Sequence, residues 1–388
     1  MSSNPVRFAV VGCGQLAQSQ HLPNIVRSPR MVLHACCDIS DENLEACRKF
    51  DPVSTSRDYL EVMKDPGVDA VCVATTETLR LPVIRAAVDA GRPIFVEKPM
   101  AASLEEAVAI RDLVVGAGIP FCVGHNRRCA PAMAEAHRIF RAHMTSPQPC
   151  PWRWDREGAN RPERAEDGVA SMNVSINDDW YSWKGYAFNR DTHGHGPMVW
   201  EMTHFVDLCN WLLASKPERV VAQESSHLNA GVVVRYATGE IATISMCANG
   251  SFGYPKESYV AMGHGGVVAN HHMVEVTTAG IEDAPPTVAF PLLNDPYDGQ
   301  VQEDGLRGWF AKRALACRDA EAHGDGARVM VSEPDKGHER MLEAFVDEIR
   351  GERGPVCGVE DALSATRVCL AALKSAREER FVQVDEVG

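Results

Sequence analysis

Three ionisable side chains, Glu201, His204 and Asp207, stand at helical spacing in the segment MVWEMTHFVDLCNWLL, residues 198–213. A histidine beside a carboxylate can accept and return a proton near neutral pH, because an unperturbed imidazole has a pKa of about 6.5. The plainer interpretation is a partly exposed histidine that contacts Glu201 or Asp207 one helical turn away. The segment alone leaves both interpretations open.

A projection of this segment as a helix separates two faces. One is an apolar stripe that predicts core packing, formed by Val199, Met202, Val206, Cys209 and Leu213. His204 lies almost opposite this stripe, among Trp200, Glu201, Asp207, Leu208 and Trp211. Two tryptophans beside three ionisable groups are typical of a wall that stacks on a sugar-like ring and moves a proton.

A second candidate is Lys98 in VEKPM, residues 96–100, at the end of a short apolar run. If that run is a parallel strand, Glu97 and Lys98 lie at its carboxyl end, where open α/β sheets bind ligands. Lys98 could donate a hydrogen bond to a substrate hydroxyl and stabilise the oxyanion that develops there. The alternative is a surface lysine that precedes a helix.

The turn GCGQLA, residues 12–17, fits the dinucleotide pattern G-x-G-x-x-A between a strand and a helix. Gly12 would allow the tight turn, and Gly14 would let backbone amides approach a pyrophosphate at the helix N-terminus. Asp38 ends the next strand and could accept hydrogen bonds from ribose hydroxyls. Since residues 39–41 include no Arg or Lys, NAD is favoured over NADP. The alternatives are a turn that binds nothing and an Asp38 that only caps a helix.

The elements that must position these residues change along the chain. Apolar strands alternate with amphipathic helices in the first third, which predicts a doubly wound parallel sheet. The expected strands are 6–12, 32–38, 68–74, 93–97 and 119–124, and the helices are 15–27, 41–50, one ending near Ala90, and 103–118.

The pattern after this region is different. A helix over 130–144 and an irregular stretch over 145–170 precede alternating runs joined by the turns ATGE and GHGG, which predict antiparallel hairpins. Two helices over 337–351 and 359–379 and a short FVQV strand close the chain. We therefore predict an α/β nucleotide-binding domain over 1–126 and an α+β domain over 127–388.

Composition narrows the classes of partner. The chain has 388 residues, 45% of them hydrophobic and 24% charged, and a net charge of −14, which argues against nucleic acid and anionic membranes. It has no apolar run near the ~18–20 residues that span a bilayer and no signal peptide, so a cytoplasmic location is expected. Its 13 cysteines form no C-x-x-C pair and indicate buried thiols in a reducing compartment.

GCGQLA, Asp38, ATTETLRLPVIRAAVDAGRPIFVEKPMA and VGHNRRCAP, in this order, resemble the glucose–fructose oxidoreductase / inositol dehydrogenase (Gfo/Idh/MocA) family. The resemblance covers residues 6–131 and returns at GHGPMVWEMTHFVDLCNWLL. It implies a Rossmann domain followed by a domain with a large open antiparallel sheet, through which members commonly form homo-oligomers. It also implies redox chemistry with NAD(P) at a hydroxyl of a sugar, polyol or sugar nucleotide.

The resemblance further implies roles for single residues. Lys98 matches the catalytic lysine of the family and His204 its catalytic histidine, while Arg127 lies where contacts to substrate or nicotinamide are usual. Many members have an acid four residues before the histidine, but here that residue is Trp200, so Glu201 is the candidate substitute. Positions that match cofactor contacts are Gly12, Gly14, Gln15, Leu16, Asp38, Thr75, Thr76, Glu97, Lys98 and Asn126.

Two other clusters carry weaker hypotheses. His193 and His195 could ligate a metal together with Glu201, but a loop before a helix is favoured and no metal is predicted. The aromatic and acidic run NDDWYSWKGY, residues 177–186, could line a carbohydrate site through Trp183. An ordinary surface strand with packed aromatics is the alternative.

Together these features predict an NAD-dependent dehydrogenase that acts on CH–OH groups. His204 would remove the hydroxyl proton, Lys98 would polarise the oxygen, and Glu201 or Asp207 would orient the imidazole. Lys98, Arg127, Trp183, Glu201 and His204 are the predicted substrate-binding residues. The alternatives are a redox-neutral glycoside hydrolase or lyase that uses transient oxidation with tightly bound NAD, and a non-catalytic NAD-binding sensor.

Overall fold

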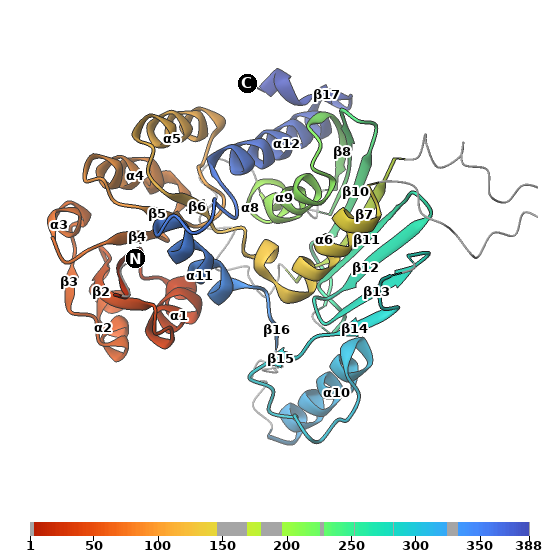
Figure 1. The fold of residues 1–388 in the computed structure, drawn as a ribbon, viewed down its shortest axis with the longest axis horizontal. Coiled ribbons are helices and arrows are strands. Elements are labelled where there is room, and N and C mark those ends of the chain that lie inside the picture. Colours follow the sequence, from red (N-terminus) through yellow and green to blue (C-terminus); the bar gives the residue numbers. More distant parts are fainter. Residues whose placement is uncertain are drawn as a thin grey trace, which may run out of the picture.

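The computed structural model describes residues 4–145, 169–179, 196–225, 229–251, 253–281, 283–323 and 333–387. This part of the chain contains a six-stranded sheet and a nine-stranded sheet, each covered by helices (Figure 1). The predicted succession of an α/β part and an α+β part is therefore confirmed. Among the described helices, none has both the length and the apolar composition needed to cross a membrane.

The first sheet is parallel throughout and has the order β3-β2-β1-β4-β5-β6. The order reverses between β1 and β4, so the turns after these two strands lie side by side at the carboxyl edge. A Cβ placed on Gly12 would lie 2.6 Å from the carbonyl carbon of Ala74. The strands are β1 (Val6–Val11), β2 (Met31–Cys37), β3 (Ser54–Ser56), β4 (Ala70–Val73), β5 (Ile94–Val96) and β6 (Phe121–Val123).

The helices that connect these strands mostly follow the sequence pattern. The predicted helix over 15–27 is a π-helical turn followed by an α-helix, and β3 and α3 were not predicted because their short, largely exposed segments lack a clear apolar period. The helical elements are η1 (Ala17–His21), α1 (Leu22–Arg27), α2 (Asp41–Cys47), η2 (Arg48–Phe50), α3 (Tyr59–Lys64), η3 (Glu77–Leu79), α4 (Arg80–Asp89) and α5 (Leu104–Ala117).

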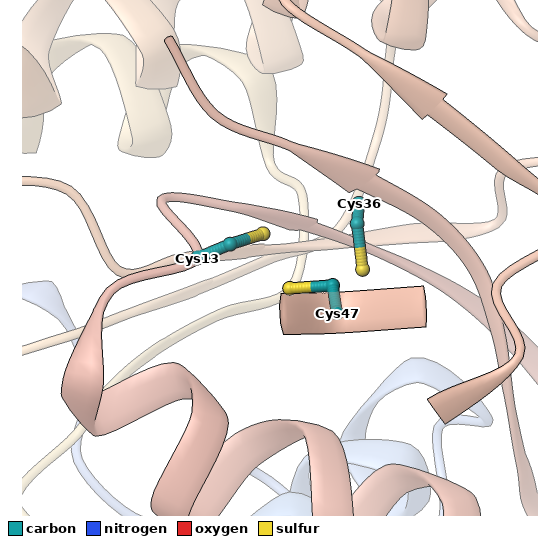
Figure 2. Close-up of side chains that lie close together, drawn as sticks. All are labelled: Cys13, Cys36 and Cys47. Atoms are coloured by element: carbon teal, nitrogen blue, oxygen red, sulfur yellow. The ribbon is translucent and has the colours of Figure 1, made fainter. Parts of the chain in front are cut away.

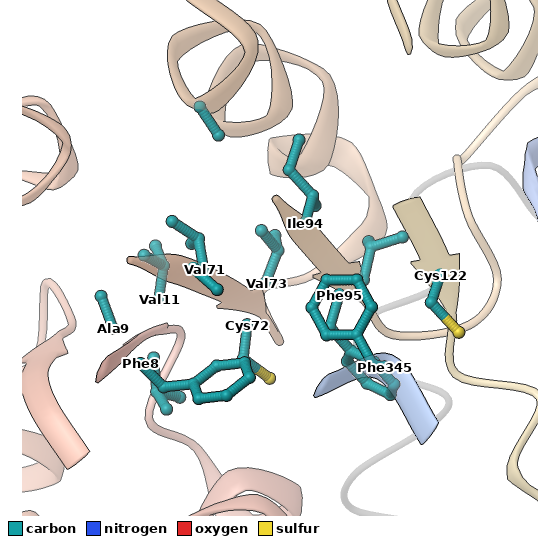
Figure 3. Close-up of a cluster of buried hydrophobic side chains, with 14 of the residues drawn as sticks. Phe8, Ala9, Val11, Val71, Cys72, Val73, Ile94, Phe95, Cys122 and Phe345 are labelled. Carbon is teal, nitrogen blue, oxygen red and sulfur yellow. The ribbon is translucent and has the colours of Figure 1, made fainter. Parts of the chain in front are cut away.

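A helix from the end of the chain completes the core of the parallel sheet. Phe345 of α11 (His338–Ile349) is fully buried, with its ring centroid 6.2 Å from that of Phe8 and 5.9 Å from that of Phe95. Figure 3 shows Phe8, Phe95 and Phe345 on one face of the sheet, opposite Val71 and other branched side chains. The chain therefore returns to its first sheet after it has built the second.

The second sheet is mixed, with the order β14-β13-β12-β11-β7-β10-β9-β8-β17. The hairpins predicted at ATGE and GHGG are present as β9–β10 and β11–β12, but β7 pairs with β10 in parallel, so the prediction of an antiparallel sheet was incomplete. The strands are β7 (Ser171–Asn177), β8 (Pro217–Glu224), β9 (Ala230–Tyr236), β10 (Ile241–Cys247), β11 (Glu257–Gly263), β12 (Gly266–His271), β13 (Glu275–Ala279), β14 (Thr287–Ala289) and β17 (Val382–Gln383), with β15 (Leu292–Leu293) and β16 (Glu333–Pro334) paired separately.

One face of this sheet is packed against helices α6, α9 and α12 (Figure 1). Burial alternates along β9, as expected for a strand with one covered face. Helix α10, which the sequence analysis did not predict, lies beside β14. The remaining helical elements are η4 (Asn126–Cys129), α6 (Pro131–His143), α8 (Pro197–Trp200), α9 (Met202–Leu213), α10 (Gly305–His323), α12 (Val359–Glu378) and η5 (Val384–Val387).

Several histidines are kept neutral by this packing. His137 of α6 stacks on Trp211 of α9 with ring centroids 3.7 Å apart, and burial lowers the pKa of His137 to about 4. Burial also lowers the pKa of His272 to about 4 and the pKa of His338 to about 3. In the unfolded chain these groups would titrate near ~6.5, so below that pH the unfolded state binds more protons and stability falls as the pH falls.

We predict that Phe345→Ala lowers the free energy of unfolding by about 3–5 kcal/mol, because it leaves a cavity between Phe8 and Phe95. Urea denaturation at neutral pH measures the change. Phe381→Ala is the control, since that side chain is 61% exposed and should cost less than about 1 kcal/mol. Equal losses for the two variants would contradict the role of α11 in the first core.

We also predict that His137→Phe weakens the dependence of stability on pH. The phenyl ring can stack on Trp211 but does not titrate, so the slope of the unfolding free energy should be shallower by up to about 1.4 kcal/mol per pH unit between about pH 6 and pH 4.5. Denaturation curves over a pH series measure this slope. Above about pH 7.5 the two proteins should show the same slope, and identical slopes in the acidic range would refute the prediction.

Candidate active site

The predicted helix over 198–213 is interrupted at Glu201, which separates α8 from α9. The backbone amide of His204 donates to the carbonyl of Glu201 at 3.1 Å, whereas a continuous helix would pair it with the carbonyl of Trp200. The carbonyl of Trp200 instead accepts a hydrogen bond from Nζ of Lys98 at 2.8 Å. The interruption thus provides a backbone acceptor for a lysine that comes from the parallel sheet.

Glu201 lies among three cations that come from different parts of the chain. Its Oε2 is 3.1 Å from Nζ of Lys98, and its Oε1 is 2.9 Å from Nζ of Lys256 and 3.5 Å from a terminal nitrogen of Arg127. Burial by itself would raise the pKa of Glu201, but Lys256, Lys98 and Arg127 hold it well below its ordinary value. Glu201 is therefore an anion that joins Lys98 to the second sheet.

The partners of Glu201 are paired in turn. Nζ of Lys256 lies 2.8 Å from Oδ2 of Asp178, and Arg127 binds Glu257 through two hydrogen bonds of 2.8 and 2.5 Å. Burial opposes ionisation of Glu257, but Arg127 lowers its pKa to about 2. The sequence analysis did not identify Lys256, Glu257 or Asp178. Their only signal was a pair of charges at the start of an alternating strand and an acid in NDDW.

His204 lies one turn after Glu201 and is 4% exposed. Its Nδ1 is buried without a hydrogen-bond partner in the described part of the chain, and its ring meets that of His125 edge-on with centroids 5.5 Å apart. Burial and then the charges of Arg127 and Lys98 lower the pKa of His204 well below its ordinary value. The imidazole is thus neutral at pH 7 and able to accept a proton.

Neither predicted carboxylate forms a hydrogen bond with the imidazole of His204 among the described residues. Asp207 is fully engaged by Arg128, whose Nε and terminal nitrogen donate to its two oxygens at 2.8 and 2.7 Å. The thiol of Cys357 also donates to Asp207 at 3.6 Å. The expectation that Glu201 or Asp207 orients His204 is therefore not met, because both carboxylates are held by cations instead.

The glycine turn has the geometry that a bound pyrophosphate requires. Gly12 has a φ of +91°, which favours glycine, and a Cβ on Gly14 would meet no atom within 4 Å. Asp38 accepts hydrogen bonds from the amides of Cys13 and Ser40 at 2.7 and 2.8 Å. A dinucleotide phosphate therefore fits beside Gly14, while Asp38 fixes the shape of the turn.

Other predicted cofactor positions line the same edge of the sheet. Glu97 is buried and its Oε1 lies 2.9 Å from Nε2 of His21, while its Oε2 accepts the amide of Lys98 at 3.1 Å. Oγ1 of Thr75 is buried without a partner in the described chain, which suits a ligand contact. Asn126 donates to the carbonyl of Lys336 at 2.7 Å.

Gln15 is exposed, and Leu16 and Thr76 are half-buried beside the glycine turn and the turn after β4. Trp183, His193 and His195 lie outside the described residues, so their predicted roles stay predictions.

Comparisons with known proteins agree with the fold and with a nucleotide-binding first part of the chain. Residues 6–125 match a family model described as "Oxidoreductase family, NAD-binding Rossmann fold". The scyllo-inositol 2-dehydrogenase (NAD(+)) of Bacillus subtilis is 36% identical over 34% of this chain, and the alignment spans only 39% of that relative.

Two solved structures show the same fold along nearly the whole chain. The scyllo-inositol dehydrogenase of Lactobacillus casei with bound NAD(H) and scyllo-inositol has a TM-score of 0.71 at 16% identity, over 98% of this chain and 100% of that one. Levoglucosan dehydrogenase in complex with NADH and levoglucosan has a TM-score of 0.73 at 19% identity, with the same coverage. The resemblance predicted from the motifs is thus confirmed, since residues 6–125 match the NAD-binding Rossmann domain of the Gfo/Idh/MocA family.

Proposed function

We propose that this chain is an NAD-dependent dehydrogenase that acts on a ring hydroxyl or keto group of a sugar, polyol or sugar derivative. One observation carries the proposal. Lys98, at the carboxyl edge of the dinucleotide-binding sheet, contacts Trp200 and Glu201 one helical turn before the buried, neutral His204. A cation that polarises oxygen and a neutral base are the two groups that oxidation of an alcohol requires.

In the proposed reaction, His204 removes the proton of the substrate hydroxyl. Lys98 donates a hydrogen bond to the same oxygen and stabilises its developing negative charge. NAD, when bound, accepts the hydride from the carbon. Since the pKa of His204 lies well below its ordinary value, the imidazole is available as a base throughout the neutral range. In the reverse direction it would need a proton from solvent or substrate.

Glu201 has a positioning role in this proposal. The carboxylate of Glu201 contacts Lys98 and forms no hydrogen bond with the imidazole of His204. Lys256 and Arg127 hold the carboxylate in place. Glu201 thus replaces the acid that many family members carry one residue earlier, and it acts through the lysine rather than through the histidine.

The cofactor would lie along the carboxyl edge of the parallel sheet. The open space at Gly14, the unpartnered Oγ1 of Thr75 and the carboxylate of Asp38 support this placement. Arg57, which the sequence analysis did not consider, reaches the first turn of α2 but is paired there with Asp41 at 2.9 Å. A cation already paired with a carboxylate is a poor site for a 2′-phosphate, so NAD stays favoured over NADP.

The substrate class follows from the relatives. The proteins compared above act on scyllo-inositol or levoglucosan by their names, and both are ring compounds with several hydroxyl groups. These names favour net oxidation over the redox-neutral alternative. The predicted homo-oligomer, cytoplasmic location and lack of nucleic-acid partners stay predictions.

We predict that the chain with NAD and a panel of inositols, sugars and levoglucosan produces NADH from at least one of them, measured by NADH absorbance. His204→Ala should lower turnover by about 10²–10⁴-fold, because the base is lost, and Lys98→Ala by about 10²–10³-fold. NAD affinity, measured by calorimetry, should survive His204→Ala.

The control for these variants is Lys216→Ala. Lys216 precedes β8 of the nine-stranded sheet, and its side chain is 68% exposed. Near-normal turnover in both His204→Ala and Lys98→Ala would contradict the proposed catalytic roles of these residues. Substrate consumption without NADH accumulation, and without added NAD, would instead support the redox-neutral alternative.

A further prediction distinguishes the role of Glu201 from that of Lys256. Glu201→Gln removes the charge that holds Lys98, so we expect kcat to fall by about tenfold or more, consistent with a lost charge-assisted contact. Lys256→Met leaves the contact between Lys98 and Glu201 in place and should cost less. Steady-state kinetics of both variants, with NAD affinity measured in parallel, test this order, and a larger loss for Lys256→Met would contradict the positioning role.

A further inference from the structure

Three cysteine thiols meet inside the nucleotide-binding part of the chain, away from the residues proposed for catalysis. Cys13 follows β1, Cys36 belongs to β2, and Cys47 ends α2. Their sulfur atoms all lie within 4.8 Å of one another, and all three residues are 0% exposed. Figure 2 shows the three side chains converging from three different elements.

We propose that Cys13, Cys36 and Cys47 form a buried three-thiol site that takes up one soft, three-coordinate metal or metalloid ion. The spacing fits such an ion. Ligand–metal distances of about 2.3 Å, as for zinc and sulfur, place three thiolates around one centre about 4.0 Å apart. A disulfide would require two of the sulfurs to approach to about 2.05 Å.

The ligand set selects the class of ion. Thiolates favour soft ions such as monovalent copper over hard ones, while zinc prefers four ligands. The cluster offers three sulfurs among the described residues. The nearby carboxylate of Asp38 is already engaged by the amides of Cys13 and Ser40 and by the side chain of Asn43.

The charge of the site favours an ion that ends with little net charge. A buried complex with a large uncompensated charge is costly, so trivalent arsenic is the most suitable probe. Arsenous acid, As(OH)₃, reacts with three thiols to form three As–S bonds, and the three hydroxyls leave as three waters. The product carries no charge, and nothing is oxidised or reduced.

The thiols are only weakly held. The thiol of Cys13 faces the carbonyls of Val10 and Cys37 at 3.6 Å each, and a thiol is a weak hydrogen-bond donor. Cys47 is followed directly by the exposed Arg48 and Lys49, so local opening of the end of α2 gives access.

The other cluster of potential metal ligands is a poorer site for an ion. His125, Asp207 and Cys357 also lie close together, but both oxygens of Asp207 are occupied by Arg128. An ion there would have to break a buried ion pair, whereas the sulfur cluster contains no cation.

Binding at the sulfur cluster would reach the cofactor site through the backbone. Cys13 lies between Gly12 and Gly14, and its amide donates to Asp38 at 2.7 Å. An ion that draws the sulfur of Cys13 toward Cys36 and Cys47 displaces this turn. We therefore expect a several-fold loss of NAD affinity when the site is filled.

The test is anaerobic incubation of the reduced chain with arsenite, followed by native mass spectrometry. One arsenic atom should be retained per chain, and peptide mapping should show Cys13, Cys36 and Cys47 protected from alkylation. Cys36→Ala and Cys47→Ala should each lower arsenite affinity by at least tenfold. Cys209→Ala and Cys369→Ala, which remove equally buried thiols elsewhere, should leave it unchanged.

X-ray absorption at the arsenic edge of the unsubstituted protein supplies a readout that does not depend on the folding of any variant. Three sulfur neighbours support the site. Failure to retain arsenic, a coordination shell of oxygen, or retention unchanged in Cys47→Ala would each overturn the proposal. None of these outcomes depends on catalytic turnover, so the proposed dehydrogenase activity is tested separately.

Discussion

A largely buried carboxylate needs cations beside it, and Glu201 has three of them, which come from separate segments of the chain. Lys98 comes from the end of β5, Arg127 from η4 and Lys256 from the residue before β11. Buried ion pairs are weak sources of net stability, but leaving one partner unpaired is strongly unfavourable. An arrangement of the two sheets that separated these groups would leave charges unpaired, so this requirement favours the observed meeting of Lys98 with the helix of His204.

The same cations control the protonation of the proposed base. Arg127 and Lys98 oppose a second positive charge nearby and, together with burial, keep His204 neutral. The site thereby combines a lysine that is paired with Glu201 at 3.1 Å with a histidine that is kept uncharged. One set of charges thus gives Lys98 and His204 opposite roles within one site.

The sequence was sufficient to predict the features that depend on a local pattern of residues. The parallel strands, the glycine turn, the position of Lys98 at the end of a strand and both hairpin turns follow from short runs of residues. The interruption of the helix at Glu201 and the pairing of Glu201 with Lys256 do not, because they arise from contacts between segments 55 residues apart. The parallel pairing of β7 with β10 was missed for the same reason, since the periodicity of a strand does not indicate which strand lies beside it.

The return of α11 to the first sheet has a consequence for folding during synthesis on the ribosome. The strands of that sheet are synthesised first, but Phe345 completes their core only when most of the chain has been made. At translation rates of about 5–20 residues per second, the delay is on the order of ten to forty seconds. During that interval Phe8 and Phe95 lack the cover that Phe345 provides, so apolar surface of the first sheet stays exposed while the ribosome is still at work.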